Sequence, residues 1–333
     1  MAAVGSGCGK AVASPSPTPA VTPAPFDVSV LTYNIMTANK AWISGMPSRY
    51  NGDLPWDVRG PVVLAKMLAR DPDIICLQEN EGMPADGVKQ VTYLAQHAPG
   101  YTVSPAATPE DTVQILFRTS QFTYLDGGSF RINTQGLNGA PKDRWCVWVK
   151  LRPQGSQRSL FVFTVHLTST SNLVRARLRS YEWDQLLAGL ERLNPGLAEP
   201  YVLAGDFNAK NNETRPVFND HLLKMAAAGI VDTSTTAESV TTIVANAQSF
   251  NLMGGPVDGT WRYGLIRTEG FHLDYICSAA STVVKESQVV LGSGLNQGVR
   301  WLAIGGTAYP FFAEGPIGSD HNPIFAALTF PVV

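Results

Sequence analysis

The sequence predicts an α+β protein in which β-sheets pack as a sandwich and few helices accompany them. Three observations carry this prediction. Short runs rich in β-branched and aromatic residues recur between loops, which is typical of strands. Few segments show helical spacing. Several strand-like runs also end at a polar residue able to bind a metal or a phosphate. Strand ends of that kind would line a cleft along one rim of the sandwich.

The expected elements follow from local patterns taken in chain order. Runs of apolar residues predict strands over 28–33, 73–77, 114–117, 145–149, 160–165, 201–204, 273–277 and 324–330. Gly60-Pro61 predicts the start of a helix to Arg70, because proline is tolerated in a first turn and Pro72 blocks continuation. A second helix is expected over 173–193. Its apolar residues at helical spacing are Val174, Leu178, Tyr181, Leu186, Leu190 and Leu193.

The N-terminal segment differs from the rest of the chain. Residues 11–25 are rich in Pro, Ser, Thr and Ala and carry no charge, and proline holds such a run extended. We therefore expect a disordered tail or tether over 1–25. With 333 residues, 44% of them hydrophobic, the chain is long enough for a large core. No second linker divides residues 26–333, which we interpret as one domain.

Composition excludes several classes of protein. The net charge of −2 argues against a polybasic nucleic-acid binder, although a local basic groove is compatible with it. The 31 aromatic residues, 7 Trp with 10 Tyr and 14 Phe, argue against a disordered chain because they bury large surfaces. No run approaches the roughly 18 apolar residues of a transmembrane helix. A globular protein without a transmembrane segment is expected.

The four cysteines give a weak signal of compartment. Cys76, Cys146 and Cys277 lie in apolar, strand-like runs that suit either buried thiols or a disulfide, so their pairing stays open. Cys8 follows Gly5-Ser6-Gly7 and could be the remnant of a lipoprotein processing site, with lipidation open. The apolar segment that export needs is not in this sequence. We expect a secreted or surface-attached protein of bacterial type.

Polar residues gather at strand boundaries in five places. Asn34 follows the first strand, Glu79 follows the second, and His166 closes the run over 160–165. Asp206 and Asn208 follow the run over 201–204, and Asp320-His321 precedes the last strand. Each cluster alone has a simple explanation, such as a cap or a tight turn. Together they indicate one shared site.

The motifs that carry these residues resemble those of the endonuclease/exonuclease/phosphatase superfamily, whose fold is DNase I-like. They are LTYNI around Asn34, CLQEN around Glu79, TVHL around His166, GDFNA around Asp206 and Asn208, LDYI around Asp274, and SDHNPI around Asp320 and His321. They stand in the family's order and span residues 31–324. The resemblance implies a catalytic domain over 26–333. It also implies a four-layer α/β sandwich, in which helices flank two packed, mostly antiparallel β-sheets.

Phosphoester cleavage explains the need for a metal and a base. Negative charge on the phosphate oxygens repels a nucleophile, and a hard divalent cation offsets that charge. Oxygen ligands such as Glu79 and the Asn34 amide suit Mg²⁺, for which Mn²⁺ or Ca²⁺ can substitute. Imidazole suits proton removal from water near neutral pH, and His321 is the expected base. By resemblance Asp274 orients His321, and Asp320 binds the metal.

The remaining site residues would act on the phosphate. Asp206 and Asn208 lie two apart on one short turn, so both side chains can reach one phosphate. The resemblance gives Asn208 a hydrogen bond to a phosphate oxygen. It leaves Asp206 to position water, assist the leaving group or hold a second metal. His166 resembles the second histidine of the DNase I and sphingomyelinase branches, where it stabilises the transition state or protonates the leaving oxygen.

The family resemblance does not choose the substrate. We expect a Mg²⁺-dependent phosphodiesterase acting on nucleic acid, as a monomer. The alternatives are a sphingomyelinase or phospholipase C acting on phospholipid head groups, and then a phosphomonoesterase. A non-enzymatic binding module on the same scaffold is the remaining alternative. Loss of hydrolysis with capture of a specific partner would support it.

Charged and aromatic side chains outside the motifs bear on that choice. Arg175, Arg177 and Arg179 are spread around the second helix, which we interpret as mostly a solvated face. Asp143, Arg144 and Lys150 are expected at a solvated strand edge outside the site. Tryptophans in loop-like stretches could enter a lipid surface. They are Trp42, Trp56, Trp261 and Trp301. The apolar run 301–312 could do the same, but we expect it to be buried.

Overall fold

The computed structural model describes most of the chain. Its described residues are 24–332 without 41–42, 44–45, 81–88, 106–111, 170–171, 211–214, 242–243, 246, 269–271, 292–298 and 313–316. The expected tail up to residue 23, with Cys8, lies outside these residues, as does Trp42. The first described strand begins at Phe26.

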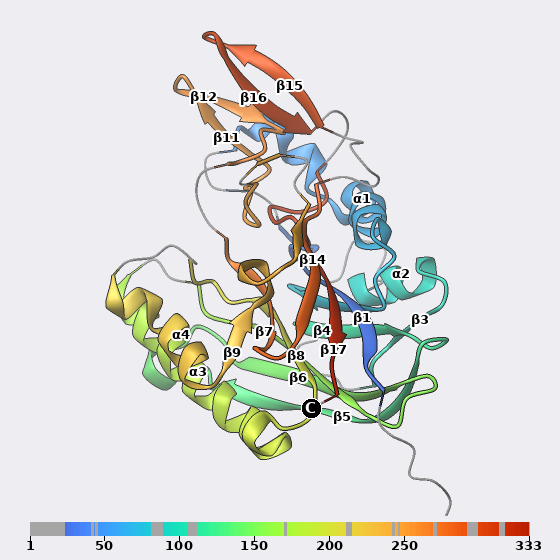
Figure 1. Cartoon of the computed structure of the whole chain (residues 1–333). Helices are drawn as coiled ribbons and strands as arrows, with labels where there is room; N and C mark the ends of the chain where they lie inside the picture. The colour runs from blue at the N-terminus through green and yellow to red at the C-terminus, as the bar shows by residue number, and fades with distance from the viewer. Residues whose placement is uncertain are drawn as a thin grey trace, which may run out of the picture.

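Two large sheets form the centre of the molecule (Figure 1). The first sheet has the strand order β10-β14-β17-β1-β2-β4-β3. Its strands are β1 (Phe26–Asn34), β2 (Ile74–Gln78), β3 (Tyr101–Val103), β4 (Val113–Arg118), β10 (Ser239–Val240), β14 (Val283–Val289) and β17 (Ile324–Phe330). The β1–β2 and β10–β14 pairs are parallel. The other neighbours are antiparallel.

The second sheet has the order β5-β6-β7-β8-β13-β9. Its strands are β5 (Phe122–Asn133), β6 (Arg144–Pro153), β7 (Leu160–His166), β8 (Tyr201–Asp206), β9 (Ile230–Asp232) and β13 (Asp274–Ala279). The β7–β8 pair is parallel, and its neighbours are antiparallel. Both sheets are therefore mostly antiparallel, as expected.

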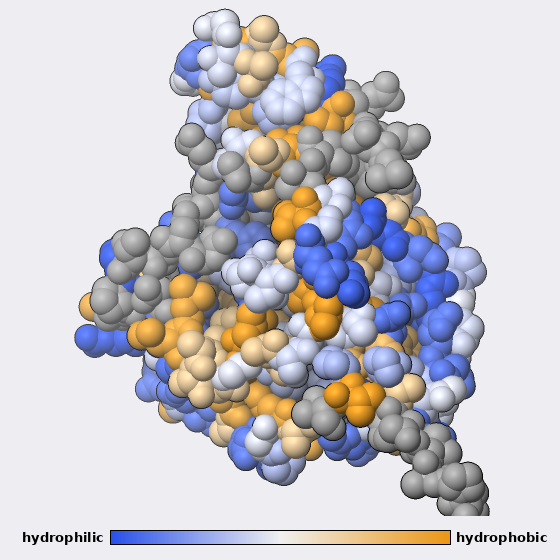
Figure 2. All heavy atoms as spheres, viewed as in Figure 1, coloured by the Kyte–Doolittle hydropathy of each residue, from blue (hydrophilic) through white to orange (hydrophobic). Residues whose placement is uncertain are grey.

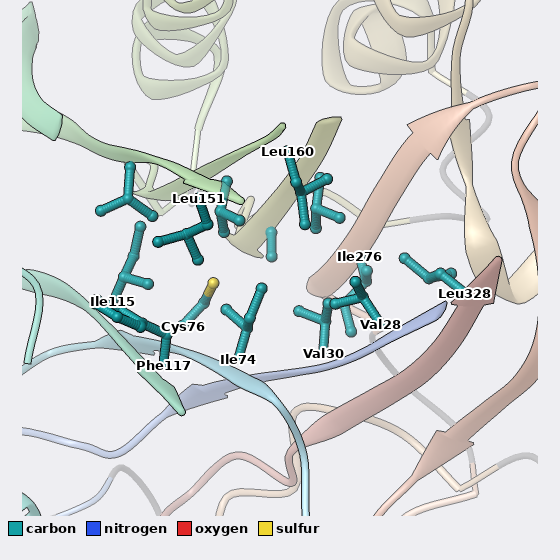
Figure 3. Close-up of a cluster of buried hydrophobic side chains, with 14 of the residues drawn as sticks. Val28, Val30, Ile74, Cys76, Ile115, Phe117, Leu151, Leu160, Ile276 and Leu328 are labelled. Atoms are coloured by element: carbon teal, nitrogen blue, oxygen red, sulfur yellow. The ribbon is translucent and has the colours of Figure 1, made fainter. Parts of the chain in front are cut away.

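The two sheets pack face to face through alternate side chains. Val28 and Val30 of β1 point into the space between the sheets, where they meet residues such as Val162 and Ile276 of the second sheet. Figure 3 shows this layer, with side chains from both sheets pointing toward one another. Because the side-chain period of a strand is two, the intervening residues of each strand face the outer layers.

Helices cover both outer faces, which confirms the expected four-layer sandwich. The helices α1 (Trp56–Leu68) and α2 (Gln90–His97) pack on the first sheet, where Val63 and Leu94 meet Leu31. The helices α3 (Leu173–Leu193) and α4 (Pro216–Ala227) pack on the second sheet. In Figure 1, the pair α1 and α2 lies on the opposite side of the sandwich from the pair α3 and α4.

Two helix predictions need correction. Helix α1 begins at Trp56 rather than Gly60, so Pro61 lies inside it. Pro55 occupies the N-cap, and its carbonyl accepts from the Arg59 N–H. Helix α3 has the predicted bounds, but Val174 is 63% exposed, whereas Arg179 is buried. The expectation of a solvated arginine face is therefore wrong at Arg179, whose guanidinium donates to the main-chain carbonyls of Asn208 and Phe218.

Two β-hairpins form one end of the molecule, at the top of Figure 1. They are β11 (Gly254–Val257) with β12 (Thr260–Tyr263), and β15 (Val299–Ile304) with β16 (Thr307–Phe312). Trp301 is 56% exposed, whereas Phe311 is buried. The expectation that 301–312 is buried is therefore wrong for the strand β15, to which Trp301 belongs. Figure 2 shows blue, white and orange atoms intermixed over this end.

The tryptophan and cysteine expectations are also resolved by the fold. Trp56 is buried in α1, and Trp261 lies in β12 rather than in a loop. Cys76, Cys146 and Cys277 are buried free thiols, and burial raises the pKa of each. None of the described helices combines the length and apolar character needed to span a bilayer.

Candidate active site

The candidate residues meet at the rim where strand ends of both sheets come together. In the second sheet, the register places His166 of β7 beside Asp206 of β8, and Asp206 beside Asp274 of β13. In the first sheet, Asn34 closes β1 next to Gln78, which precedes Glu79. Strand pairing thus aligns polar side chains that lie far apart in the sequence.

His321 and Asp274 form a buried pair that joins the two sheets. His321 precedes β17 of the first sheet, and its Nδ1 lies 2.7 Å from Asp274 Oδ2. Burial lowers the pKa of His321, but Asp274, Asp206 and Asp320 outweigh this effect and raise it to about 10. The carboxylate thus fixes the ring, with Nε2 lying 3.9 Å from Asp206 Oδ2. Such a pair can orient an imidazole for proton transfer.

Asp206 lies at the centre of the group. Its Oδ2 accepts a hydrogen bond from Asn34 Nδ2 at 3.0 Å and lies 3.5 Å from His166 Nε2. Burial and the charge of Asp274 raise the pKa of Asp206 to about 7. This carboxyl can therefore gain or lose a proton near neutral pH, which suits an acid–base group.

Asn34 connects Asp206 to Glu79. Its Nδ2 also donates to Glu79 Oε1 at 3.2 Å, and its Oδ1 accepts from the Met36 N–H at 3.1 Å. The Thr37 N–H donates to Glu79 Oε2 at 3.2 Å. Burial raises the pKa of Glu79, but His321 and these two hydrogen bonds outweigh it, so the net shift is downward. Glu79 is thus held as a carboxylate.

Asp320 provides a second carboxylate near Glu79. Burial raises the pKa of Asp320; nearby His321 acts against the rise, and Glu79 adds to it. Ser319 ties this loop to β1, because its Oγ donates to the Asn34 carbonyl at 2.7 Å. Glu79 and Asp320 carry like charges close to one another, and their repulsion favours a cation between them.

His166 lies beside a cation that the sequence analysis left out of the site. Arg144 is 7% exposed, and its Nη1 donates to the His166 carbonyl at 3.0 Å. The expectation that Arg144 lies at a solvated edge is therefore wrong, because its side chain is buried against the end of β7. Burial, together with Arg144 and Lys142, lowers the pKa of His166 well below its usual value. His166 is neutral and can donate a hydrogen bond.

Asn208 is held by main-chain contacts on a constrained turn. Its Nδ2 donates to the Leu167 carbonyl at 2.9 Å, and its own N–H donates to Asp206 Oδ1 at 2.8 Å. Its φ of 50° is left-handed, as are those of Met36 (57°) and Glu79 (54°). Strained backbone of this kind gathers at functional sites. The surrounding contacts fix all three turns.

A cavity of about 680 Å³ opens onto these side chains. Six of the eight predicted residues line it: Glu79, His166, Asp206, Asn208, Asp320 and His321. Asn34 and Asp274 lie behind that surface, hydrogen-bonded to Asp206 and His321. Lys40, Lys142 and Arg144 also line the cavity, and they were not predicted as site residues. The available signal was that Lys142 lies just before β6 and Arg144 begins it, next to the strand that ends at His166.

Two sets of side chains could hold a divalent cation. Asp206, Asp274 and His321 offer ligand atoms within 4.8 Å of one another, and this cluster could bind a metal. Two of its members are, however, engaged with each other in the His321–Asp274 hydrogen bond. Glu79 and Asp320 are hard carboxylate donors whose repulsion a cation would relieve. We therefore regard Glu79 and Asp320 as the better fit.

The sequence as a whole matches a known family of enzymes. The model of the Endonuclease/Exonuclease/phosphatase family matches residues 31–321. The chain belongs to this family. This family is generally dependent on divalent metal ions.

Individual members are only distantly similar. Protein angel of Drosophila melanogaster is 24% identical over 193 residues, which cover 54% of this chain and 51% of that protein. The chain thus spans about half the length of this relative. A mannosyl-6-phosphatase from Bacteroides thetaiotaomicron has a TM-score of 0.64 at 19% identity, covering 91% of this chain and 100% of the other.

A further structural neighbour carries a bound nucleotide analogue. ANGEL2, a 2′,3′-cyclic phosphatase in complex with adenosine-2′,3′-vanadate, has a TM-score of 0.60 at 18% identity. The match covers 92% of this chain and 96% of the other. At such identities the structural matches show the shared fold.

Proposed function

We propose that this protein is a Mg²⁺-dependent phosphodiesterase that acts on nucleic acid or a nucleotide diester. The observation that carries the proposal is that the His321–Asp274 pair, Asp206 and the Glu79–Asp320 carboxylates converge at one cavity. We further propose that the protein is exported, on the basis of the proline-rich segment over 11–25.

The His321–Asp274 pair would remove a proton from the attacking water. Because Nδ1 faces Asp274 Oδ2, the ring is oriented with Nε2 toward Asp206 and the cavity. His321 must first be neutral, and the surrounding carboxylates hold its pKa at about 10 against the effect of burial. Positive charge in the cavity would lower that pKa toward the working range of a base.

Glu79 and Asp320 would hold the cation, with Asn34 orienting Glu79 through the 3.2 Å hydrogen bond. When bound, the cation would supply the charge that offsets the phosphate oxygens. Asp206, with a pKa of about 7, could hold or release a proton near neutral pH. Its contacts with Asn34 and His166 place it to position water or to assist the leaving group.

The cavity wall supports a polyanionic substrate. Lys40, Lys142 and Arg144 add positive charge around the phosphate position, and such side chains contact the phosphates of nucleic acids. His166 and Asn208 would donate hydrogen bonds to the scissile phosphate. The nucleotide analogue bound by ANGEL2 is consistent with this choice, but it was observed in that protein.

A second candidate function is a phosphomonoesterase. The structural match to a mannosyl-6-phosphatase favours it, because that neighbour has the same fold. A monoester carries one more negative charge near the same cations. The substrate panel below separates the two candidates.

The test is a comparison of substrates with Mg²⁺ and with EDTA. We would assay bis-p-nitrophenyl phosphate, p-nitrophenyl phosphate, plasmid DNA, RNA and sphingomyelin vesicles. Cleavage of the diester and of nucleic acid, abolished by EDTA and restored by Mg²⁺, is the expected result. Preference for the monoester would favour the second candidate, and cleavage of vesicles alone would move the specificity to a lipid head group. No cleavage of any substrate would contradict the proposal.

A further inference from the structure

Arg59 on α1 has an unusual environment for an arginine. Its side chain is buried, with 0% exposure, and it makes no ion pair with a described residue. All five of its N–H donors reach main-chain carbonyls. Nε donates to Leu54 at 2.8 Å, Nη1 to Ile35 at 2.6 Å and Gly318 at 3.0 Å, and Nη2 to Met36 at 2.5 Å and Thr37 at 2.6 Å. The guanidinium is therefore fully satisfied by five separate carbonyls.

These carbonyls belong to the segments that carry the proposed cation ligands. Ile35, Met36 and Thr37 directly follow Asn34, and the N–H of Thr37 donates to Glu79. Gly318 lies two residues before Asp320. Arg59 thus connects the loop that holds Glu79 to the loop that carries Asp320.

The bound loop cannot easily hold this shape by itself. Met36 has a left-handed φ of 57°, which is uncommon for a residue with a long side chain. Three successive carbonyls turned toward one point would also repel one another without a donor between them. A planar guanidinium with a fixed fork of donors satisfies them, whereas a lysine has three donors on one nitrogen.

The charge of Arg59 acts on the same carboxylates. Arg59 keeps its proton at neutral pH, since burial lowers its pKa only to about 10 and the charge of Asp320 opposes that fall. Arg59 therefore places a permanent positive charge behind the loops that carry the two carboxylates.

We infer that Arg59 is a positioning residue for the cation site: it fixes the two loops that present Glu79 and Asp320 and thereby sets the affinity for the divalent ion. This inference rests on the proposed cation site. Arg59 does not contact the cavity, so its effect passes through the carbonyls that it binds.

The test measures metal binding directly. Isothermal titration of the purified protein with Mg²⁺ and with Mn²⁺, without substrate, would compare wild type with Arg59→Lys. Residues that orient metal ligands typically change affinity by about 10–100-fold when replaced, and we expect a loss in that range. The matched control is Arg158→Lys. Arg158 also donates to carbonyls, those of Phe330 and Pro331, but among the described residues it has no contact with the site. The affinity of the Arg158→Lys variant for both ions should equal that of wild type.

A second variant covers the case in which Arg59→Lys does not fold. Gln90 binds the same loop from α2, with Nε2 donating to the Met36 carbonyl at 3.1 Å and Oε1 accepting from the Ala38 N–H at 3.0 Å. Gln90→Met leaves Arg59 in place and should weaken the affinity in the same direction by a smaller factor. Folding of each variant is checked by thermal melting.

The outcomes separate the two proposals. A wild-type protein that binds neither ion would overturn the cation site and the role of Arg59 with it. Wild-type binding with unchanged affinity in folded Arg59→Lys would overturn the role of Arg59 and leave the cation site standing. If only Gln90→Met can be purified, unchanged affinity in that variant would also overturn the role of Arg59. Equal weakening in Arg158→Lys would show a general effect of stability and contradict the inference.

Discussion

The two sheets contribute different chemistry to the site. The first sheet and its loops supply oxygen donors, Glu79 and Asp320, held by turns with left-handed backbone and by the buried Arg59. The second sheet supplies titratable groups, His166, Asp206 and Asp274, held in regular strand register. Loops can wrap around an ion, whereas strand register fixes distances between proton-transfer groups. We therefore assign cation binding to the first sheet and proton transfer mostly to the second.

His321 should give the largest effect, because it joins the two halves through Asp274. General acid–base groups typically contribute about 10²–10⁴-fold in rate. His321→Ala should therefore lower kcat by that range while Mg²⁺ binding persists. The measurement is the steady-state hydrolysis of bis-p-nitrophenyl phosphate. The control is His97→Ala, since His97 is exposed on α2, and a near wild-type rate for His321→Ala would contradict the role of the base.

Glu79 and His166 test the division between the sheets. Glu79→Ala should weaken Mg²⁺ binding by at least about tenfold, because a carboxylate ligand is lost from the first sheet. His166→Gln should lower kcat with little change in the affinity for Mg²⁺. Titration calorimetry and the Mg²⁺ dependence of activity measure both quantities. An equal loss of metal affinity in the two variants would remove the proposed division.

Arg144 should act on substrate binding rather than on the chemical step. Hydrogen bonds to charged groups contribute about 1.5–3 kcal/mol, so Arg144→Met should raise KM for the diester by roughly tenfold or more. Arg152→Met on the same strand is the control, because Arg152 is exposed. A fall in kcat at unchanged KM would place Arg144 in the chemical step instead.

The last prediction concerns stability behind the first sheet and leaves the rate of hydrolysis unchanged. Lys66 is buried, and burial lowers its pKa from 10.5 to about 7. Between those values the unfolded chain binds the proton and the folded protein does not, so Lys66 makes stability rise as the pH increases from about 7 to 10.5. The slope for one proton is at most about 1.4 kcal/mol per pH unit.

Lys66→Met should remove this rise and increase the free energy of unfolding at pH 7. Urea denaturation between pH 7 and 9.5 measures the difference in the free energy of unfolding between wild type and Lys66→Met. Other groups titrate in both proteins, so their contributions cancel in this difference. A difference that is constant across this range would show that Lys66 does not lose its proton in the folded protein. The hydrogen bond of Lys66 Nζ to Asn322 Oδ1, at 3.4 Å, gives the substitution a small opposing cost.

The sequence alone determined the order of the motifs, the central strands and the whole of α3. Strands buried on both faces are continuous apolar runs, and a polar residue at the end of such a run is visible without a structure. For this reason seven of the eight predicted site residues stand out before any geometry is known, and Asp274 was added by the resemblance of its motif to the family. Their assembly at one rim then follows from strand register, as for His166 and Asp206.

The tertiary structure decided what depends on partners distant in the chain. Arg144 and Arg179 look solvated in the sequence, yet both are buried because main-chain carbonyls from other segments accept their donors. The exposure of Trp301 depends on which side of a hairpin packs on the molecule. Arg59 is the extreme case, since its five acceptors come from three separate segments. No local pattern encodes such a meeting, because burial of a charge is possible only where the fold brings enough acceptors together.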